Sequence, residues 1–307
     1  MLSRRHFLAA SLANTLAVPL IGSSMSSVAE AADAKPLLID SHVHVWKHDP
    51  QYPFAPGRVV PPEDRTAEML LDLMKANGVS RTVIIQVIHY TWDNRYLADV
   101  LKRYPGNFKG VCRVNPEDPA NADQLSKLVE EQGFHGVRLS PAGDAQGDWI
   151  KGPLMAPLWR RCAQLKVPMT ILAPVTRMPD LMPLIEQNPD LTVVVDHMAD
   201  SPLDHPEQLQ MLLDLVRYPK VYVKISHMWS LSKQAYPYGD SLDQVKRLFG
   251  AFGPKRLMWG TDWPICLDQL PYDKAVELYR DHFGFLSRED HEQVLYKTVQ
   301  DVWSFGL

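Results

Sequence analysis

Short apolar segments alternate with amphipathic segments along most of the chain. Between the strand candidates and after the last one, apolar residues recur at helical spacing over 63–76, 94–104, 119–132, 153–165, 178–187, 207–217, 241–252, 271–282 and 287–303. Runs such as TVIIQV and LTVVVD are typical of parallel strands that are covered on both faces. The strand candidates are 37–41, 82–87, 110–114, 136–139, 168–172, 192–196, 221–225 and 257–260.

This alternation predicts right-handed βαβ units and a parallel sheet. Eight units rather than five or six favour a closed barrel over an open, doubly wound sheet. The sequence contains neither a G-x-G-x-x-G motif nor a Walker loop, which argues against a nucleotide-binding sheet. We therefore expect an α/β fold, a single (β/α)8 TIM barrel followed by C-terminal helices.

The N-terminal segment has a different character from the rest of the chain. Residues 3–8, SRRHFL, resemble a twin-arginine export signal, and 7–21 supply a mildly apolar stretch after the two arginines. Ala29-Glu30-Ala31 and Ala32-Asp33-Ala34 are A-x-A-like cleavage sites. We expect a signal peptide over 1–34, cleaved near 31–34, a catalytic barrel over 35–307, and a periplasmic or secreted mature protein.

Composition adds limits on the partners of this chain. Hydrophobic residues make up 46% and charged residues 22%, as in ordinary globular proteins. The formal net charge of -4 gives no electrostatic reason to expect nucleic acid or an anionic membrane surface. No apolar run in the body is long enough to span a bilayer. We expect a small-molecule substrate, no nucleic-acid partner and no membrane span in the mature protein, and we leave a homodimer open.

Polar residues follow most of the predicted strands. In a (β/α)8 barrel, the carboxyl ends of the strands meet at one face and carry the site. The fifth strand ends in Ala173-Pro174, which offers no polar side chain. The polar residues at the other ends are Asp40, His42, His44, Gln86, His89, Arg113, Asn115, Arg138, Ser140, Asp196, His197, Lys224, Ser226, His227, Thr261 and Asp262.

His42 and His44 are separated by one residue at the end of the first strand. In an extended chain, residues i and i+2 point to the same side, so both imidazoles can bind one divalent cation such as Zn²⁺. The alternative is that this pair only forms hydrogen bonds to backbone or substrate. His197 and Asp262 at matching positions favour a shared site, in which all four residues bind the metal.

Asp262 follows the last strand in the segment GTDWP and is the candidate proton acceptor for an attacking water. The alternative is that its side chain caps the following turn. His197 is either a metal ligand or a catalytic residue that orients the substrate and stabilises developing negative charge. The adjacent Asp196 is a candidate partner that holds the ring of His197.

Five further residues are candidates for binding the substrate. The guanidinium of Arg138 suits a carboxylate or a carbonyl oxygen, with a structural salt bridge as the alternative, and Arg113 carries the same proposal. Lys224 lies between apolar neighbours, so it is either paired with a carboxylate or directed at the site. His89 and Trp46 complete the set. Loop aromatics expected to be exposed suggest an apolar pocket wall: Trp46, Tyr52, Tyr90, Trp92, Trp149 and Trp229.

Four segments together resemble the amidohydrolase superfamily, and within it the amidohydrolase-related (type 2) branch, which includes sugar-lactone and pyrone-dicarboxylate lactonases. They are IDSHVHVW at 39–46, GFHGVRL at 133–139, VVDHM at 194–198 and GTDWP at 260–264. The resemblance covers essentially the whole mature chain. It implies a hydrolase that opens a small lactone or related cyclic ester by attack of water.

Two departures from the superfamily pattern bear on the metal. Binuclear members carry a bridging lysine or acid where this chain has Arg138-Leu139-Ser140, and many carry a histidine where it has Ala173-Pro174. The resemblance therefore implies one divalent metal, zinc being the first choice, or a metal-independent site. The runner-up activity is non-oxidative decarboxylation of a small unsaturated or aromatic carboxylic acid. A non-catalytic binding protein would be expected to lose Asp262 or the histidine pair.

Overall fold

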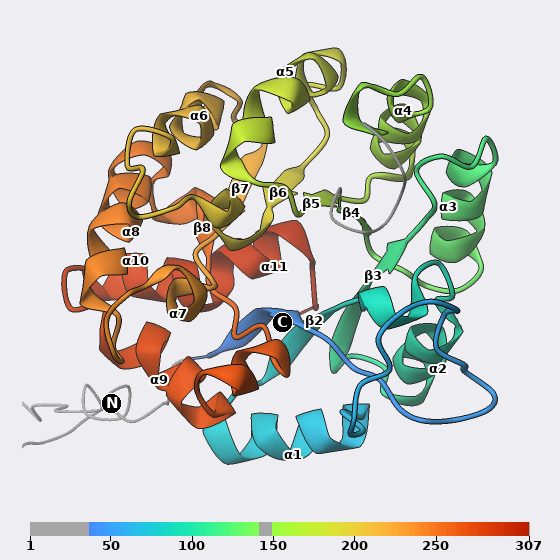
Figure 1. Ribbon diagram of the computed structural model, residues 1–307, viewed down its shortest axis with the longest axis horizontal. Helices are drawn as coiled ribbons and strands as arrows, with labels where there is room; N and C mark the ends of the chain where they lie inside the picture. The colour runs from blue at the N-terminus through green and yellow to red at the C-terminus, as the bar shows by residue number, and fades with distance from the viewer. Residues whose placement is uncertain (1–36, 141–148, 307) are drawn as a thin grey trace, which may run out of the picture. The chain divides into compact units, whose positions relative to one another are not determined.

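The computed structural model describes residues 37–140 and 149–306, which fall within one compact unit, Pro36–Leu307. Within these residues, eight parallel strands pair in chain order around a barrel (Figure 1). The predicted barrel is confirmed. The strands are β1 (Ile39–Val43), β2 (Arg81–Ile85), β3 (Phe108–Arg113), β4 (Val137–Leu139), β5 (Met169–Ile171), β6 (Val193–Val195), β7 (Val221–Lys224) and β8 (Leu257–Met258).

Helices connect the strands and form the outer layer of the barrel (Figure 1). Three of them, α9 to α11, follow the last strand, as predicted. The helices are α1 (Ala67–Asn77), α2 (Arg95–Arg103), α3 (Asn121–Glu130), α4 (Met155–Leu165), α5 (Met178–Gln187), α6 (Leu209–Leu213), α7 (Met228–Leu231), α8 (Gly239–Phe252), α9 (Tyr272–Asp281), α10 (Arg288–Glu292) and α11 (Thr298–Val302).

Local chemistry sets the ends of these helices. The stretch predicted from residue 63 begins as a helix only at Ala67, because Oγ1 of Thr66 accepts a hydrogen bond from the amide of Met69. It ends at Gly78, whose φ of 72° suits glycine. The stretch predicted over 287–303 consists of α10, a π-helical turn and α11. Helix α7 was not predicted, because four residues are too few to show a helical period.

Backbone hydrogen bonds between the first and last strand regions bring the ends of the sheet together. The amide of His44 donates to the carbonyl of Trp263 at 2.7 Å, and the amide of Asp262 donates to the carbonyl of His42 at 2.9 Å. A parallel bridge pairs Val43 with Trp263. These contacts place the polar ends of β1 and β8 side by side.

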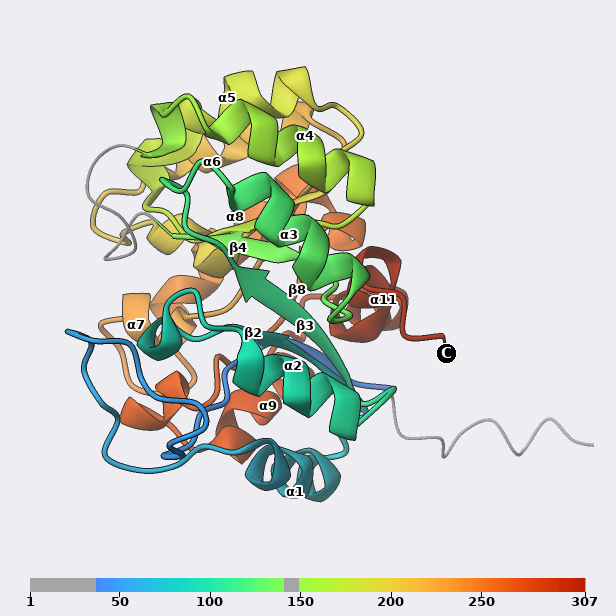
Figure 2. The ribbon, with the colours of Figure 1, turned by 90° about the vertical axis from the view of Figure 1, so that its right-hand side faces the viewer.

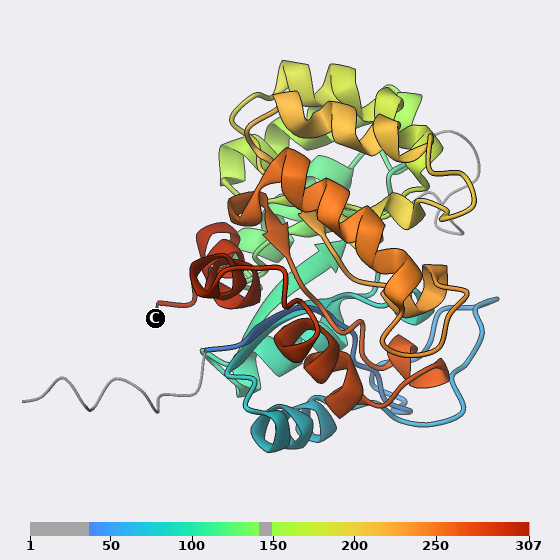
Figure 3. The same ribbon diagram turned by 90° about the vertical axis from the view of Figure 1, so that its left-hand side faces the viewer.

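One end of the barrel is filled by apolar side chains. Val299 of α11 and the following Trp303 pack into a cluster with Ile39, Val83, Ile85, Val111, Val194 and Met258 from the strands. Figures 2 and 3 show α11 at one end of the barrel, with α7 and the β1–α1 loop at the opposite end. The polar residues therefore lie at the opposite end of the barrel, at the carboxyl ends of the strands.

The predicted signal peptide, with both candidate cleavage sites, lies outside the described residues. Among the residues that are described, none of the helices has the length and apolar character needed to cross a membrane.

Candidate active site

His42 of β1 and His44, which directly follows the strand, face each other, as their spacing predicts. Their Nε2 atoms lie 3.4 Å apart, and the pairing of β1 with β2 shifts register between Asp40 and Val43, which re-aims the strand end. Nδ1 of His44 lies 2.8 Å from the carbonyl oxygen of Ile85. Because a carbonyl only accepts, Nδ1 donates to it, and in this tautomer Nε2 presents its lone pair toward His42.

Asp262, in the segment that follows β8, lies next to this histidine pair. Its Oδ1 lies 3.4 Å from Nε2 of His42 and 3.2 Å from Nε2 of His44, and it accepts no hydrogen bond. Burial opposes ionisation of Asp262, but the charge of His227 and its hydrogen bond keep the pKa of the carboxyl well below the usual range. The carboxylate thus faces the histidine pair instead of capping the turn that follows it.

The ends of β1 and β8 pack closely against each other. A Cβ atom on Gly260 would lie 2.9 Å from Cβ of His42, so only glycine fits there without a shift. Beside it, the carboxylate of Asp40 accepts hydrogen bonds from the amide of His42 at 3.0 Å, the amide of Thr261 at 3.1 Å and Oγ1 of Thr261 at 2.6 Å. These contacts fix Asp262 relative to the histidine pair.

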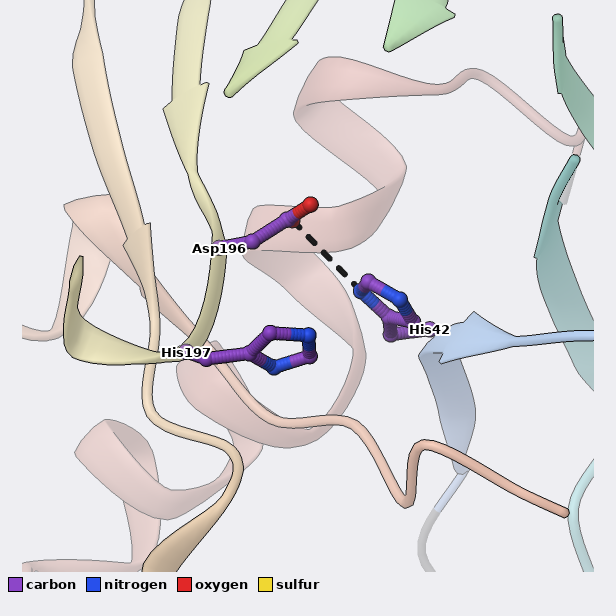
Figure 4. A group of neighbouring side chains, drawn as sticks. All are labelled: His42, Asp196 and His197. Atoms are coloured by element: carbon purple, nitrogen blue, oxygen red, sulfur yellow. Dashed lines mark ion pairs between the residues drawn. The ribbon is translucent and has the colours of Figure 1, made fainter. Parts of the chain in front are cut away.

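Asp196 forms the buried centre beneath His42. Its Oδ1 lies 3.5 Å from Nδ1 of His42 (Figure 4). The same Oδ1 lies 3.0 Å from Nζ of Lys224, and Oδ2 lies 3.1 Å from Nε of Arg138. Burial opposes ionisation of Asp196, but Lys224, His42 and Arg138 hold its pKa well below the usual range. Two of the three cations predicted to bind substrate, Arg138 and Lys224, therefore form ion pairs with Asp196, which is the structural alternative left open for each.

Burial, followed by the charge of Lys224, lowers the pKa of His42 to about 3. The ring is therefore neutral at ordinary pH, with Nδ1 directed at Asp196 and Lys224 and Nε2 at Asp262. A carboxylate that holds the far nitrogen of an imidazole is a common partner of a metal-binding histidine.

His197 enters the site through an unusual turn of the chain. Residues 197–200 all have positive φ, which is 53° at His197. This turn places the ring of His197 beside that of His42, with the two ring centroids 4.5 Å apart (Figure 4). Its Nδ1 lies 2.7 Å from Oγ of Ser226. The expectation that Asp196 holds this ring is therefore wrong, because the turn separates the two side chains. Burial and the neighbouring His227 lower the pKa of His197, so its ring is neutral.

His227 is a site residue that sequence reasoning did not assign. Its Nε2 lies 2.6 Å from Oδ2 of Asp262, and its ring stacks on His197 with centroids 3.6 Å apart and planes within 5°. Although burial opposes protonation, Asp262 and Asp200 raise its pKa to about 9. Its place after β7 was visible in the sequence. Its orientation was not, because a φ of 65° turns the chain there.

Arg113 lies at the end of β3, fully buried and near Arg138. Burial first, and then the charge of Arg138, lower the pKa of Arg113 well below its ordinary value. Its guanidinium carbon lies 5.8 Å from the ring of Trp92. Two guanidinium groups thus lie close together at neighbouring strand ends.

Trp46 and His89 lie in the loops after β1 and β2, where their rings meet edge to face at 5.1 Å. The indole N–H of Trp46 donates to the carbonyl of Glu63 at 2.8 Å, which braces the β1–α1 loop. His44 is near enough to contribute, after burial, to a lowered pKa of His89. The two residues therefore border the cluster beside His44.

The expected exposure of the loop aromatics is wrong for four of the six. Trp46, Tyr52, Tyr90 and Trp149 are buried, because they pack into the main apolar core cluster. Trp92 and Trp229 are partly exposed and remain available to form a pocket wall.

Among the described residues, three sets of side chains place possible ligand atoms within 4.8 Å of one another: His42, Asp196 and His197; His42, His44 and Asp262; His197, His227 and Asp262. Asp196 is already paired with Lys224 and Arg138, and Nε2 of His227 is occupied by Asp262. The remaining set, His42, His44 and Asp262, suits a divalent cation with nitrogen and oxygen ligands. An ionised, unbonded carboxylate oxygen that faces the lone pair of His44 at 3.2 Å supports this fit.

Comparison with known proteins agrees with this geometry. The family model described as Amidohydrolase matches residues 39–305. An L-fucono-1,5-lactonase of Burkholderia ambifaria is 28% identical over 235 residues, which cover 74% of this chain and 80% of that protein. A 2-pyrone-4,6-dicarboxylate hydrolase of Comamonas testosteroni is 29% identical over 260 residues, which cover 80% of this chain and 83% of that protein.

A solved structure of an amidohydrolase from Burkholderia multivorans with bound zinc shares the fold. Its TM-score is 0.70 at 21% identity, covering 88% of this chain and 99% of that chain. The family match extends from β1 to beyond α11 and so includes every strand end that carries a site residue. The chain is a hydrolase that belongs to the amidohydrolase family.

Proposed function

We propose that this enzyme opens a small, carboxylate-bearing lactone by attack of water, with one zinc ion bound by His42, His44 and Asp262, and with His197 in the second of its two candidate roles, toward the substrate. The observation that carries the proposal is the position of Asp262. Its carboxylate is ionised and buried, and its unbonded Oδ1 faces the Nε2 atoms of both histidines. A base in that position can take a proton from water at the same point where a cation would bind.

In the proposed reaction, water adds to the lactone carbonyl while Asp262 accepts a proton from it. The ring C–O bond then breaks, and the alkoxide that leaves takes the proton back from Asp262. The atoms of one water are thereby added across the ester bond. The neutral ring of His197 donates a hydrogen bond from Nε2 to the carbonyl oxygen if Nδ1 accepts from Ser226, and this stabilises negative charge on that oxygen.

A bound zinc ion supplies Lewis acidity toward water and the carbonyl at this position. The chain contributes the ligands and their orientation. The carbonyl of Ile85 fixes the ring of His44, and Asp196 with Lys224 lies behind the ring of His42. The end of β5 offers no further side-chain ligand, because Ala173 and Pro174 carry no donor atom in their side chains, which supports a single metal.

The buried cations support a negatively charged substrate. Arg113, Arg138 and Lys224 lie at the ends of three strands, and Asp196 pairs with two of them. A carboxylate on the substrate would be attracted by the adjacent guanidinium groups of Arg113 and Arg138. The dicarboxylate named for the Comamonas relative has this chemistry.

The test is a panel of lactones assayed with purified protein, followed by acid release at constant pH. Carboxylated lactones, such as a muconolactone and a pyrone dicarboxylate, are compared with neutral aldonolactones. We expect kcat/KM to be at least tenfold higher for the carboxylated members. Zinc content is measured on the same samples before and after chelation, and chelation is expected to remove activity that added zinc restores.

Two results would overturn the proposal. Release of CO₂ from unsaturated or aromatic carboxylic acids without lactone opening would indicate the decarboxylase. Full activity in protein shown to be free of divalent metal would remove zinc from the mechanism. A preference for neutral lactones would contradict the carboxylate-bearing substrate and the assigned role of Arg113 and Arg138, but not the opening of a lactone by water.

We also propose that the protein leaves the cytoplasm through the twin-arginine pathway, on the basis of Arg4, Arg5 and the apolar stretch that follows. Cell fractionation of the unaltered chain and of an Arg4→Lys, Arg5→Lys variant tests this. Export of the unaltered chain and cytoplasmic retention of the variant are expected, and equal export of both would contradict the proposal.

A further inference from the structure

His227 joins Asp262 to a second carboxylate. On one side, its Nε2 lies 2.6 Å from Oδ2 of Asp262, and on the other, its Nδ1 lies 3.5 Å from Oδ1 of Asp200. The side chains run outward from the buried Asp262, 3% exposed, through His227, 16% exposed, to Asp200, 42% exposed. These three residues form one chain, carboxylate to imidazole to carboxylate.

All three residues of this chain have left-handed backbone conformations, with φ of 58° at Asp262, 65° at His227 and 46° at Asp200. Non-glycine residues adopt this region at a cost in free energy, and such residues concentrate at functional sites. Three of them in direct side-chain contact indicate that the fold keeps this arrangement for a purpose other than stability.

The two oxygens of Asp262 have different partners. Oδ2 is held by His227, whereas Oδ1 faces Nε2 of His42 and Nε2 of His44 and accepts no hydrogen bond. A carboxylate held at one oxygen cannot rotate freely about its terminal bond, so its second oxygen stays directed at the histidine pair.

We infer that His227 is a positioning residue of this site, which binds one oxygen of Asp262 and thereby directs the other at the metal and the attacking water. This inference rests on the proposed function, because it assigns His227 a role toward the general base and the zinc site. The ring also stacks on His197, so its place is fixed from two directions.

Two conservative substitutions separate this role from a structural one. In His227→Gln, the side-chain amide nitrogen occupies the place of Nε2 and can still donate to Asp262. In His227→Asn, the shorter amide reaches the place of Nδ1, near Asp200, and the contact with Asp262 is lost. Both variants lose the ring and its stacking on His197, so that loss is matched between them.

Zinc affinity is measured by calorimetry, with kcat and KM determined on the best carboxylated lactone and melting temperature on the same samples. For His227→Asn we expect zinc affinity and kcat each to fall about 10–100-fold, the usual effect of removing a residue that orients a ligand. KM should change little. For His227→Gln we expect both quantities to stay within about threefold of the unaltered protein. His205→Gln, at an exposed histidine, is the control.

If zinc affinity and kcat fall equally in the Gln and Asn variants, and melting temperature falls with them, only the ring of His227 matters. That result would overturn the inference. Unchanged zinc affinity and kcat in His227→Asn would also overturn it. If the unaltered protein binds zinc but opens no lactone, the proposed substrate fails, while the zinc affinities still decide the role of His227. Absence of both zinc binding and lactone opening would overturn the inference and the proposed function together.

Discussion

Nζ of Lys224 lies 3.0 Å from Oδ1 of Asp196, and both side chains are completely buried inside the barrel. Arg138 reaches the other oxygen of the same carboxylate. A buried charge is tolerated only when it is paired, because taking it out of water costs several kcal/mol. This ion pair therefore determines how strongly a substitution at Lys224 or Asp196 reduces the stability of the protein.

We predict strong coupling between Lys224 and Asp196. Lys224→Met leaves Asp196 with one cation fewer and should reduce the free energy of unfolding by about 3–5 kcal/mol. Asp196→Asn should also destabilise, because two buried cations lose their partner. The double variant should lose less than the sum of the single losses, by about 1–3 kcal/mol, in urea unfolding. Additive losses would contradict the predicted coupling.

We predict that Asp262→Asn removes the proton acceptor while preserving the fold. The amide can still accept from His227, but it cannot take a proton from water, so kcat should fall about 10²–10⁴-fold. Initial rates on the best lactone, with melting temperature measured in parallel, check this. Asp268→Asn, at an exposed aspartate six residues further along the chain, should leave the rate unchanged. A variant with more than a tenth of the original kcat would exclude Asp262 as the general base.

We predict that Gly260→Ala damages the site through His42. The added Cβ would meet Cβ of His42 at 2.9 Å and its amide nitrogen at 3.1 Å, so the end of β1 must shift. Stability should fall by about 1–3 kcal/mol, and kcat should fall at least tenfold, because small misplacements of reacting groups are costly. Urea unfolding and initial rates measure the two effects.

Gly250→Ala provides the matched control. Gly250 lies in α8 with no atom near its missing Cβ, so alanine there should be neutral or stabilise by up to about 1 kcal/mol. If both alanine variants behave alike, close packing against His42 does not explain the need for glycine at position 260.

We predict that His135 contributes to acid destabilisation far from the site. Burial, followed by the charge of Lys109, lowers its pKa from 6.5 to about 4. Between these two values the unfolded chain binds a proton that the folded chain does not, so stability is lost as pH falls from 6.5 to 4. After allowance for solvent screening at this half-buried position, the loss should be about 1–2 kcal/mol.

His135→Asn tests this, because the amide oxygen can replace Nδ1, which accepts a hydrogen bond from the amide of Gly110 at 3.3 Å. Urea unfolding at pH 7 and pH 4.5 should show a smaller decrease for the variant than for the unaltered protein. His205→Asn, at an exposed histidine, should follow the unaltered protein. Equal decreases in all three proteins would show that His135 stays protonatable in the folded state.

The alternation of apolar runs and helical stretches was sufficient to predict the barrel. Apolar runs such as LTVVVD are typical of a parallel strand that is covered on both faces. The barrel then places all strand ends at one face, which brought His42, His44, His197 and Asp262 together in the prediction as they are in the structure. Their roles in catalysis remain predictions.

Orientation at the strand ends could not be predicted, because it depends on backbone angles that the residue types do not specify. The left-handed turns at His197 and His227 bring in side chains that strand alternation would direct elsewhere, and they separate Asp196 from His197. Four of the six loop aromatics are buried because they pack into the apolar core, and a local pattern does not reveal this.

The sequence by itself determined the order of the elements, the face that carries the site and the two β1 histidines, because these depend on periodicity and on strand geometry. The tertiary structure alone decided the pairing of Lys224 and Arg138 with Asp196 and the contact of His227 with Asp262. Each of these contacts joins residues from different strand ends, and their distances are set by barrel closure and by loop backbone angles, not by separation along the chain.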